Sequence, residues 1–465
     1  MKFLRPLCTL LFGVSVLLFF GLAYPHHLHY QEQFQLFLFD HTYVWEIISH
    51  PGGMADLLGR FTTQFFLYAW VGALIIAILL TAVQLLTARF IRGGWLYGLS
   101  YLPSFLLWLF LLDEYALMGG IWAILLTQLT AWTILSLLCG WKRYVALIAA
   151  VPVLYFLAGP VCLPIPTDFL WSGIHYYRYP TVFPWLLWAA ALSIFGIVLL
   201  DRGLRRIKFL SSNTPLPIVT SFALVTLCMG TVVWKHTNFK AEKVMQYDFM
   251  ARHGQWNRIL EAIDSEKPNN QIGVTVQNLA LAMHGMLLDR MFNYNQNGIA
   301  GLLPDVQSDA TSPLPTAEAF YQLGMIAVAQ RTVFEAQEAI LDFQKSGRCY
   351  KRLAQTNLIN GQYEVARKYL TALQKTLFYR DWANETLPLL GDEKAIAEHP
   401  EYGRLRQMAY TNDFYFSDHV TPEMLEGLYL HNTDNSMAYQ YLVAYYLLTG
   451  DREGYANLLH QMNQQ

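Results

Sequence analysis

The chain has 465 residues and a formal net charge of -2, and 54% of its residues are hydrophobic while only 14% are charged. A balance this close to neutral, without a basic helix or an arginine-rich tail, argues against nucleic acid as a partner. The apolar residues are concentrated in residues 1–234, which indicates a membrane domain followed by a more polar one.

Seven long apolar segments occur in residues 1–234, and we predict that each crosses a membrane as a helix. Each is close to the ~20 residues that a helix needs to span the hydrocarbon core. No Asp, Glu, Lys or Arg lies in the middle of any of them, which argues against a proton pump, an ion-coupled transporter or a voltage sensor. The predicted spans are 4–24, 65–88, 94–112, 117–139, 144–163, 183–201 and 216–234.

The basic residues of the first 234 positions predict which way the spans run. An excess of Lys and Arg marks cytoplasmic loops, and the clusters here place the N-terminus in the cytoplasm. With seven crossings, residues 235–465 then lie on the extracytoplasmic side. The clusters lie at alternate span ends and consist of Lys2, Arg5, Arg89, Arg92, Lys142, Arg143, Arg202, Arg205, Arg206 and Lys208.

The first outer loop, residues 25–64, contains three apolar patches separated by polar residues and by Pro51-Gly52-Gly53. This pattern predicts two or three short amphipathic helices at the membrane surface. Three side chains near its start, His27, His29 and Glu32, are of the types that bind a divalent metal ion. The alternative is that histidines pack at the interface as amphipathic polar tips.

Further polar residues of the outer loops are candidates for chemistry. Glu32 or Asp40 could act as a general base or a metal ligand, and Arg178 with His175 could contact a lipid-linked phosphate. The alternative is that short loops expose solvated residues at their tips. Motifs for phosphate-binding loops, Cys-x-x-Cys sites, His-Glu-x-x-His sites and nucleophile elbows are absent from the sequence.

Residues 235–465 are rich in charged residues, and their apolar residues recur with helical spacing, so we predict a soluble helical-hairpin domain. Phe320, Leu323 and Gly324 align with Tyr350, Leu353 and Ala354 at an offset of thirty residues, and Ala327 and Ala336 are further packing positions of the first unit. In this pattern, which continues through Gly361, Tyr363 and Ala366, the chain resembles the tetratricopeptide repeat. The resemblance is good over 316–375 and loose over 240–265 and 436–462.

The first outer loop also resembles that of C-type integral-membrane glycosyltransferases. Those enzymes carry a catalytic acid shortly after the first span, and Glu32, in HYQEQ, falls at that place with Asp40 as the reserve. The resemblance implies a lipid-linked sugar donor at the outer membrane face and allows a divalent metal as cofactor. The usual pair of acids and a second long outer loop are missing here.

The whole chain resembles uncharacterised bacterial polytopic envelope proteins, whose first outer loop reads similarly (YPHHLHYQEQFQLF…PGG). The resemblance implies a multi-pass protein of the bacterial inner membrane and no particular activity. We therefore predict an all-α protein with a seven-span transmembrane domain (1–234) and an extracytoplasmic, tetratricopeptide-like domain (235–465). The first functional hypothesis is a scaffold whose repeats bind an envelope protein or peptide, with membrane lipids as further partners. The alternative is the glycosyltransferase, and a transporter or channel ranks last.

Overall fold

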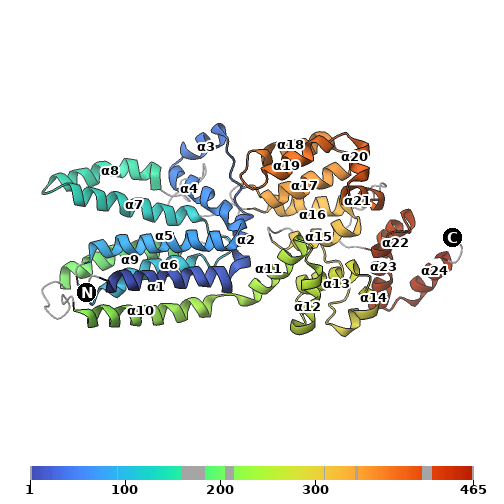
Figure 1. The fold of residues 1–465 in the computed structure, drawn as a ribbon, viewed down its shortest axis with the longest axis horizontal. Helices are drawn as coiled ribbons and strands as arrows, with labels where there is room; N and C mark the ends of the chain where they lie inside the picture. Colours follow the sequence, from blue (N-terminus) through green and yellow to red (C-terminus); the bar gives the residue numbers. More distant parts are fainter. Residues whose placement is uncertain are drawn as a thin grey trace. The chain divides into compact units, whose positions relative to one another are not determined.

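A computed structural model describes residues 3–91, 93–158, 184–204, 214–307, 309, 311–340, 344–410 and 421–462. Within these ranges every regular element is a helix, which confirms the all-α prediction (Figure 1). The chain divides into two compact units, Met1–Glu242 and Lys243–Gln465. The division falls inside α11 (Phe239–Arg252), shortly after the last predicted span.

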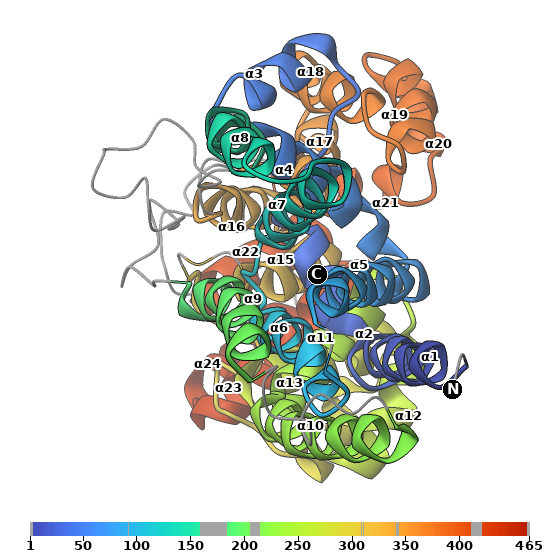
Figure 2. The same ribbon diagram turned by 90° about the vertical axis from the view of Figure 1, so that its left-hand side faces the viewer.

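Five described helices of the first unit are long and apolar enough to cross a membrane. Contacting helices of this group lie side by side in Figure 1, and Figure 2 shows the helices nearly end-on. Because their sequences are apolar on every side, each can face both lipid and neighbouring helices. They are α1 (Leu4–Leu18, continued by a π-helical turn over Phe19–Ala23), α5 (Ala69–Phe90), α7 (Met118–Leu137), α9 (Trp185–Leu204) and α10 (Pro215–His236).

The remaining two predicted spans form shorter helices. Residues 94–112 contain a 3-10 turn, Tyr97–Tyr101, followed by α6 (Leu102–Phe110). The apolar helix Tyr97–Phe110 is ~20 Å long, which is shorter than the ~30 Å of a hydrocarbon core. The other segment forms α8 (Lys142–Ala158), which has Pro152 inside it, and residues 159–163 lie outside the described ranges.

Residues 25–64, the predicted first outer loop, fold into short helices; those over 41–48 and 53–63 contain predicted apolar patches, whereas the helix over 25–32 is not indicated by such a patch. They are α2 (Pro25–Glu32), α3 (His41–Ile48) and α4 (Gly53–Thr63), which ends in a 3-10 turn over Gln64–Leu67. Helix α4 packs closely on α7, and a Cβ atom on Gly59 would lie 2.4 Å from the Gly119 nitrogen. A partly buried ion pair of 2.8 Å joins Arg60 to Asp56 one helical turn earlier.

Aromatic side chains fill much of the first unit's core. The ring of Phe12 on α1 makes edge contacts with Tyr101 and Phe105, at centroid distances of 5.3 and 5.2 Å. Trp108 stacks on Phe105 in the same cluster. Edge-to-face rings of this kind contribute packing energy between the apolar helices beyond the area that they bury.

The second unit consists of short helices that pack in consecutive pairs, among them α15 with α16 and α17 with α18. Its largest core runs through most of these helices and contains buried Leu, Ile, Ala and Tyr side chains. After α11 the helices are α12 (Trp256–Glu266), α13 (Gln271–Met283), α14 (Leu287–Arg290), α15 (Pro313–Leu323), α16 (Ile326–Glu338), α17 (Gly347–Ile359), α18 (Tyr363–Gln374), α19 (Arg380–Thr386), α20 (Glu393–Glu398), α21 (Tyr402–Met408), α22 (Pro422–His431), α23 (Ser436–Thr449) and α24 (Arg452–Met462).

Five helices of this unit end in the same way, at Gly254, Gly285, Gly324, Gly361 and Gly450. Each of these glycines has a positive φ, between 63° and 94°, a backbone conformation that glycine adopts without a steric penalty. The next residue donates its backbone N–H to the carbonyl five residues before it, at 2.8 to 3.1 Å. This is the Schellman motif, and the following helix begins one residue later in all five cases.

Candidate functional site

Helix α2 carries most of the residues that the sequence singles out, and its polar side chains are buried. Proline at the first helical position favours its start, since proline has no N–H to leave unsatisfied there. The next two backbone N–H groups, of His26 and His27, donate to the Glu242 carboxylate at 2.8 and 2.9 Å. An acid at a helix N-terminus also interacts favourably with the helix dipole.

His27 is fully buried and is held by the end of α6. Its Nε2 donates to the Leu111 carbonyl oxygen at 2.8 Å, and its ring stacks on Tyr24 at 4.5 Å between centroids. Burial lowers the pKa of His27 to about 4, because the charged imidazolium would lose its hydration. The side chain is therefore neutral at pH 7, and its Nδ1 has no hydrogen-bond partner among the described residues.

The proposed metal ligands His27, His29 and Glu32 lie on this one helix. Within the described ranges, no three His, Cys, Asp or Glu side chains gather closely enough to hold a metal ion. The helix itself separates two of them, because residues two positions apart, such as His27 and His29, point to nearly opposite sides. His29 instead approaches His26, with ring centroids 5.8 Å apart.

The two candidate catalytic acids occupy different settings. Glu32 is the last residue of α2 and its side chain is buried, with 4% of the residue exposed. Asp40 is half-buried and caps α3, where its Oδ1 accepts hydrogen bonds from the Thr42 and Tyr43 backbone nitrogens at 2.9 and 3.4 Å. Helix capping thus accounts for Asp40. His175 and Arg178 lie outside the described residues.

Neighbouring glutamines of the same segment bind backbone and side-chain groups of other elements. The Gln31 side-chain amide donates to the Leu111 and Asp113 carbonyls at 3.4 and 3.2 Å. Gln35 accepts a hydrogen bond of 3.2 Å from Thr63, at the end of α4. These contacts attach residues 31–35 to the chain just after α6 and to the end of α4, so the polar residues of this segment contribute to folding as well as to any chemistry.

A second candidate site, a cluster of basic side chains, lies in the second unit, on α17. Arg348, Lys351 and Arg352 are spaced so that they share one face of this helix. Arg348 makes a two-pronged, buried ion pair with Asp248, at 2.6 and 2.7 Å. Arg352 pairs with Glu318, and its guanidinium lies 3.6 Å from the centre of the Tyr321 ring.

Lys351 differs from these two arginines because it has no acidic partner. Its ammonium lies over the Trp382 ring, 4.9 Å from the ring centre, and no carboxylate of a described residue lies within 4.0 Å of it. Burial, and then the charges of Arg252 and Arg352, lower its pKa to about 8. The Arg352 Nη1 nitrogen is also buried without a hydrogen-bond partner among the described residues.

Sequence reasoning missed this cluster. The sequence signal for its cationic face is three basic residues at helical spacing. The structure shows that most other residues of this helix are buried. Its aromatic partner Trp382 and the neighbouring Arg252 are distant in the sequence, so only the fold brings them together. The cluster is a candidate site for an anionic group, because it contains more cationic groups than described acids pair with.

A family model described as "Family of unknown function (DUF6057)" matches residues 1–465. No curated protein and no solved structure matches the chain.

Proposed function

Since the chain belongs to this family of unknown function over its whole length, we propose a role from its own residues. It is a multi-pass protein of the bacterial inner membrane whose helical second unit binds a protein or peptide partner. In this proposal α6 and α8 complete seven crossings with the five long helices. The distribution of Lys and Arg supports a cytoplasmic N-terminus and an extracytoplasmic second unit.

The helix pairs of the second unit support the binding role. Consecutive pairs whose two helices are joined by a short glycine turn, as in α15 with α16 and α17 with α18, are typical of tetratricopeptide-like repeats. Stacked pairs of this kind present an extended surface for peptides and proteins. The role also fits the near-neutral charge, which favours proteins and lipids over nucleic acids as partners.

The observation that carries the proposal is the ammonium of Lys351. A cation that is withdrawn from water without a counter-ion costs free energy, and an incoming carboxylate would remove that cost. Trp382 supplies an apolar face beside it, and Arg352 supplies an N–H that lacks an acceptor. We infer that the partner places an Asp or Glu side chain, or a C-terminal carboxylate, against Lys351.

This proposal is tested with the full-length protein in lipid nanodiscs and an array of acidic peptides, each paired with a control peptide in which Asn, Gln and a C-terminal amide replace every carboxylate. We expect the acidic peptides to bind more tightly than their controls. Lys351→Met should lower the affinity for the acidic peptides about tenfold or more. Affinity should also fall as the pH rises through about 8, because Lys351 then loses its proton.

Lys368→Met is the matched control, because Lys368 is an exposed lysine on the neighbouring α18. It should leave peptide binding unchanged. Equal affinity of wild type and Lys351→Met for every acidic peptide, or no preference for acids over amides, contradicts the proposal.

The glycosyltransferase alternative depends on Glu32, a buried acid at the position that the resemblance assigns to catalysis. A carboxylate withdrawn from water is a common setting for a functional acid. If the alternative holds, the purified protein with Mn²⁺ transfers sugar from a polyprenyl-linked donor, and Glu32→Gln lowers the rate about a hundredfold or more. Asp40→Asn tests the reserve acid in the same assay. Absence of transfer by the wild type rejects this alternative.

A further inference from the structure

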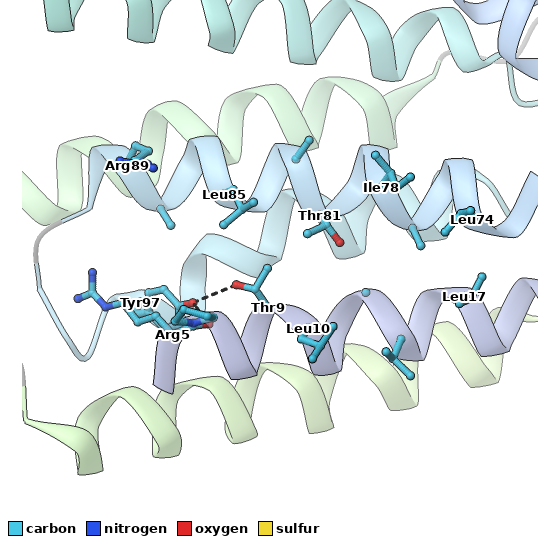
Figure 3. A pocket seen from close by; sticks show the side chains of 16 residues that line it. Arg5, Thr9, Leu10, Leu17, Leu74, Ile78, Thr81, Leu85, Arg89 and Tyr97 are labelled. Carbon is cyan, nitrogen blue, oxygen red and sulfur yellow. Dashed lines mark hydrogen bonds between the residues drawn. The ribbon is translucent and has the colours of Figure 1, made fainter. Parts of the chain in front are cut away.

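A lipid-facing groove runs between α1 and α5 of the first unit, away from the outer-loop residues discussed above. Its volume is about 860 Å³, within the ~300–1,000 Å³ of typical ligand pockets. The walls are mostly aliphatic, with Leu10, Leu17, Leu74 and Ile78 among the lining residues (Figure 3). Gly13 forms part of its floor, since a Cβ atom there would lie 3.0 Å from the Thr81 hydroxyl.

Both cationic side chains of the groove lie at the same end. Figure 3 shows Arg5 and Arg89 together at one end, while Leu17 and Leu74 lie at the other. Arg5 belongs to the first turn of α1 and Arg89 to the last turn of α5. The two arginines lie at the same end because α1 and α5 are antiparallel neighbours, so the start of α1 lies beside the end of α5.

The arginines are positioned for an anion. The Arg5 guanidinium lies 4.9 Å from the centre of the Tyr97 ring, which orients it at the groove end. Arg89 is exposed, its guanidinium lies 6.0 Å from the centre of the Trp132 ring on α7, and it forms no ion pair with any described residue. Guanidinium groups match the planar, multiple acceptor geometry of phosphate, and two of them flank this end of the groove.

The groove length fits one leaflet. From Arg5 to Leu17 the helix rises by ~18 Å, which is close to the ~15 Å depth of half a hydrocarbon core. A charged end at the level of the headgroups and an aliphatic trough below it complement a phospholipid. We propose that the α1/α5 groove is a binding site for one anionic phospholipid, with its phosphate between Arg5 and Arg89 and an acyl chain along the trough.

The site is tested by native mass spectrometry of the full-length protein, offered equal amounts of phosphatidylglycerol and phosphatidylcholine. The wild type should retain one phosphatidylglycerol in preference to phosphatidylcholine. Substituting both arginines, Arg5→Gln with Arg89→Gln, should lower this retention about tenfold or more. Arg202→Gln, which changes an exposed arginine near the end of α9, should retain lipid as the wild type does.

A second variant tests the trough and leaves the arginines in place. Ala82 lines the groove and is half-buried, so Ala82→Phe should fill the trough and reduce retention of both lipids. This result keeps the proposal testable if the arginine variants fold poorly. Retention of phosphatidylglycerol by the double arginine variant at the wild-type level, or equal retention of the two lipids by the wild type, overturns it.

Discussion

At the scale of single residues, buried polar groups of this protein are held by partners that lie far away in the chain. His27 donates to the Leu111 carbonyl, and Arg348 pairs with Asp248. Such groups stay buried because their hydrogen bonds replace those lost to water. The residue types were visible in the sequence, but these partners were not, so a histidine-rich loop suggested a metal site.

The neutral state of His27 predicts a pH dependence of stability. Its folded-state pKa of about 4 lies below the ordinary value of 6.5, so the unfolded chain binds a proton more readily. The folded state is therefore favoured most above pH 6.5, and loses up to about 3 kcal/mol as the pH falls from 6.5 to 4. Thermal unfolding midpoints across this range, in detergent, measure the loss.

His27→Gln should flatten this dependence, because glutamine can still donate to Leu111 and does not titrate. His41→Gln, at an exposed position on α3, should leave the wild-type slope in place. A slope unchanged by His27→Gln would show that other groups cause the acid sensitivity.

At the scale of helices, the sequence predicted the long elements well and the short ones less well. The five long apolar helices follow from hydropathy alone, because each needs no partner to satisfy its backbone in lipid. The segment 94–112 fails to form one long helix, since Gly93-Gly94 stands at its start, Tyr97–Tyr101 is a 3-10 turn and Pro103 stands at the start of α6. Helix α2 was missed as a helix, and its geometry is what separates His27 from His29.

The close packing of α4 on α7 predicts a strong effect of a single methyl group. Gly59→Ala places Cβ 2.4 Å from a backbone nitrogen of α7, so the helices must move apart. We expect the free energy of unfolding to fall by about 1–3 kcal/mol. Gly196→Ala is the control, because its added Cβ on α9 has no described atom within 4 Å apart from the adjoining residues and backbone of its own helix. It should stabilise the protein by up to about 1 kcal/mol, and equal thermal midpoints for the two variants would contradict the packing argument.

At the scale of the whole molecule, each unit has a core of its own, one rich in aromatic rings and one built from short helix pairs. Composition alone predicted this change of character along the chain. Composition does not predict the cationic cluster, because Arg252, Lys351 and Trp382 come from three separate helices. Their proximity depends on how the pairs stack, which no local sequence pattern specifies.

The recurrent glycine turns constrain how the second unit can change over evolution. A helix advances by about 100° per residue, so one residue inserted between a turn glycine and the next helix would rotate the apolar face of that helix away from its neighbours. Whole hairpins, by contrast, can be gained or lost without altering the remaining turns. We expect natural variants of this chain to differ by complete helix pairs, and to keep each of these connections at a constant length.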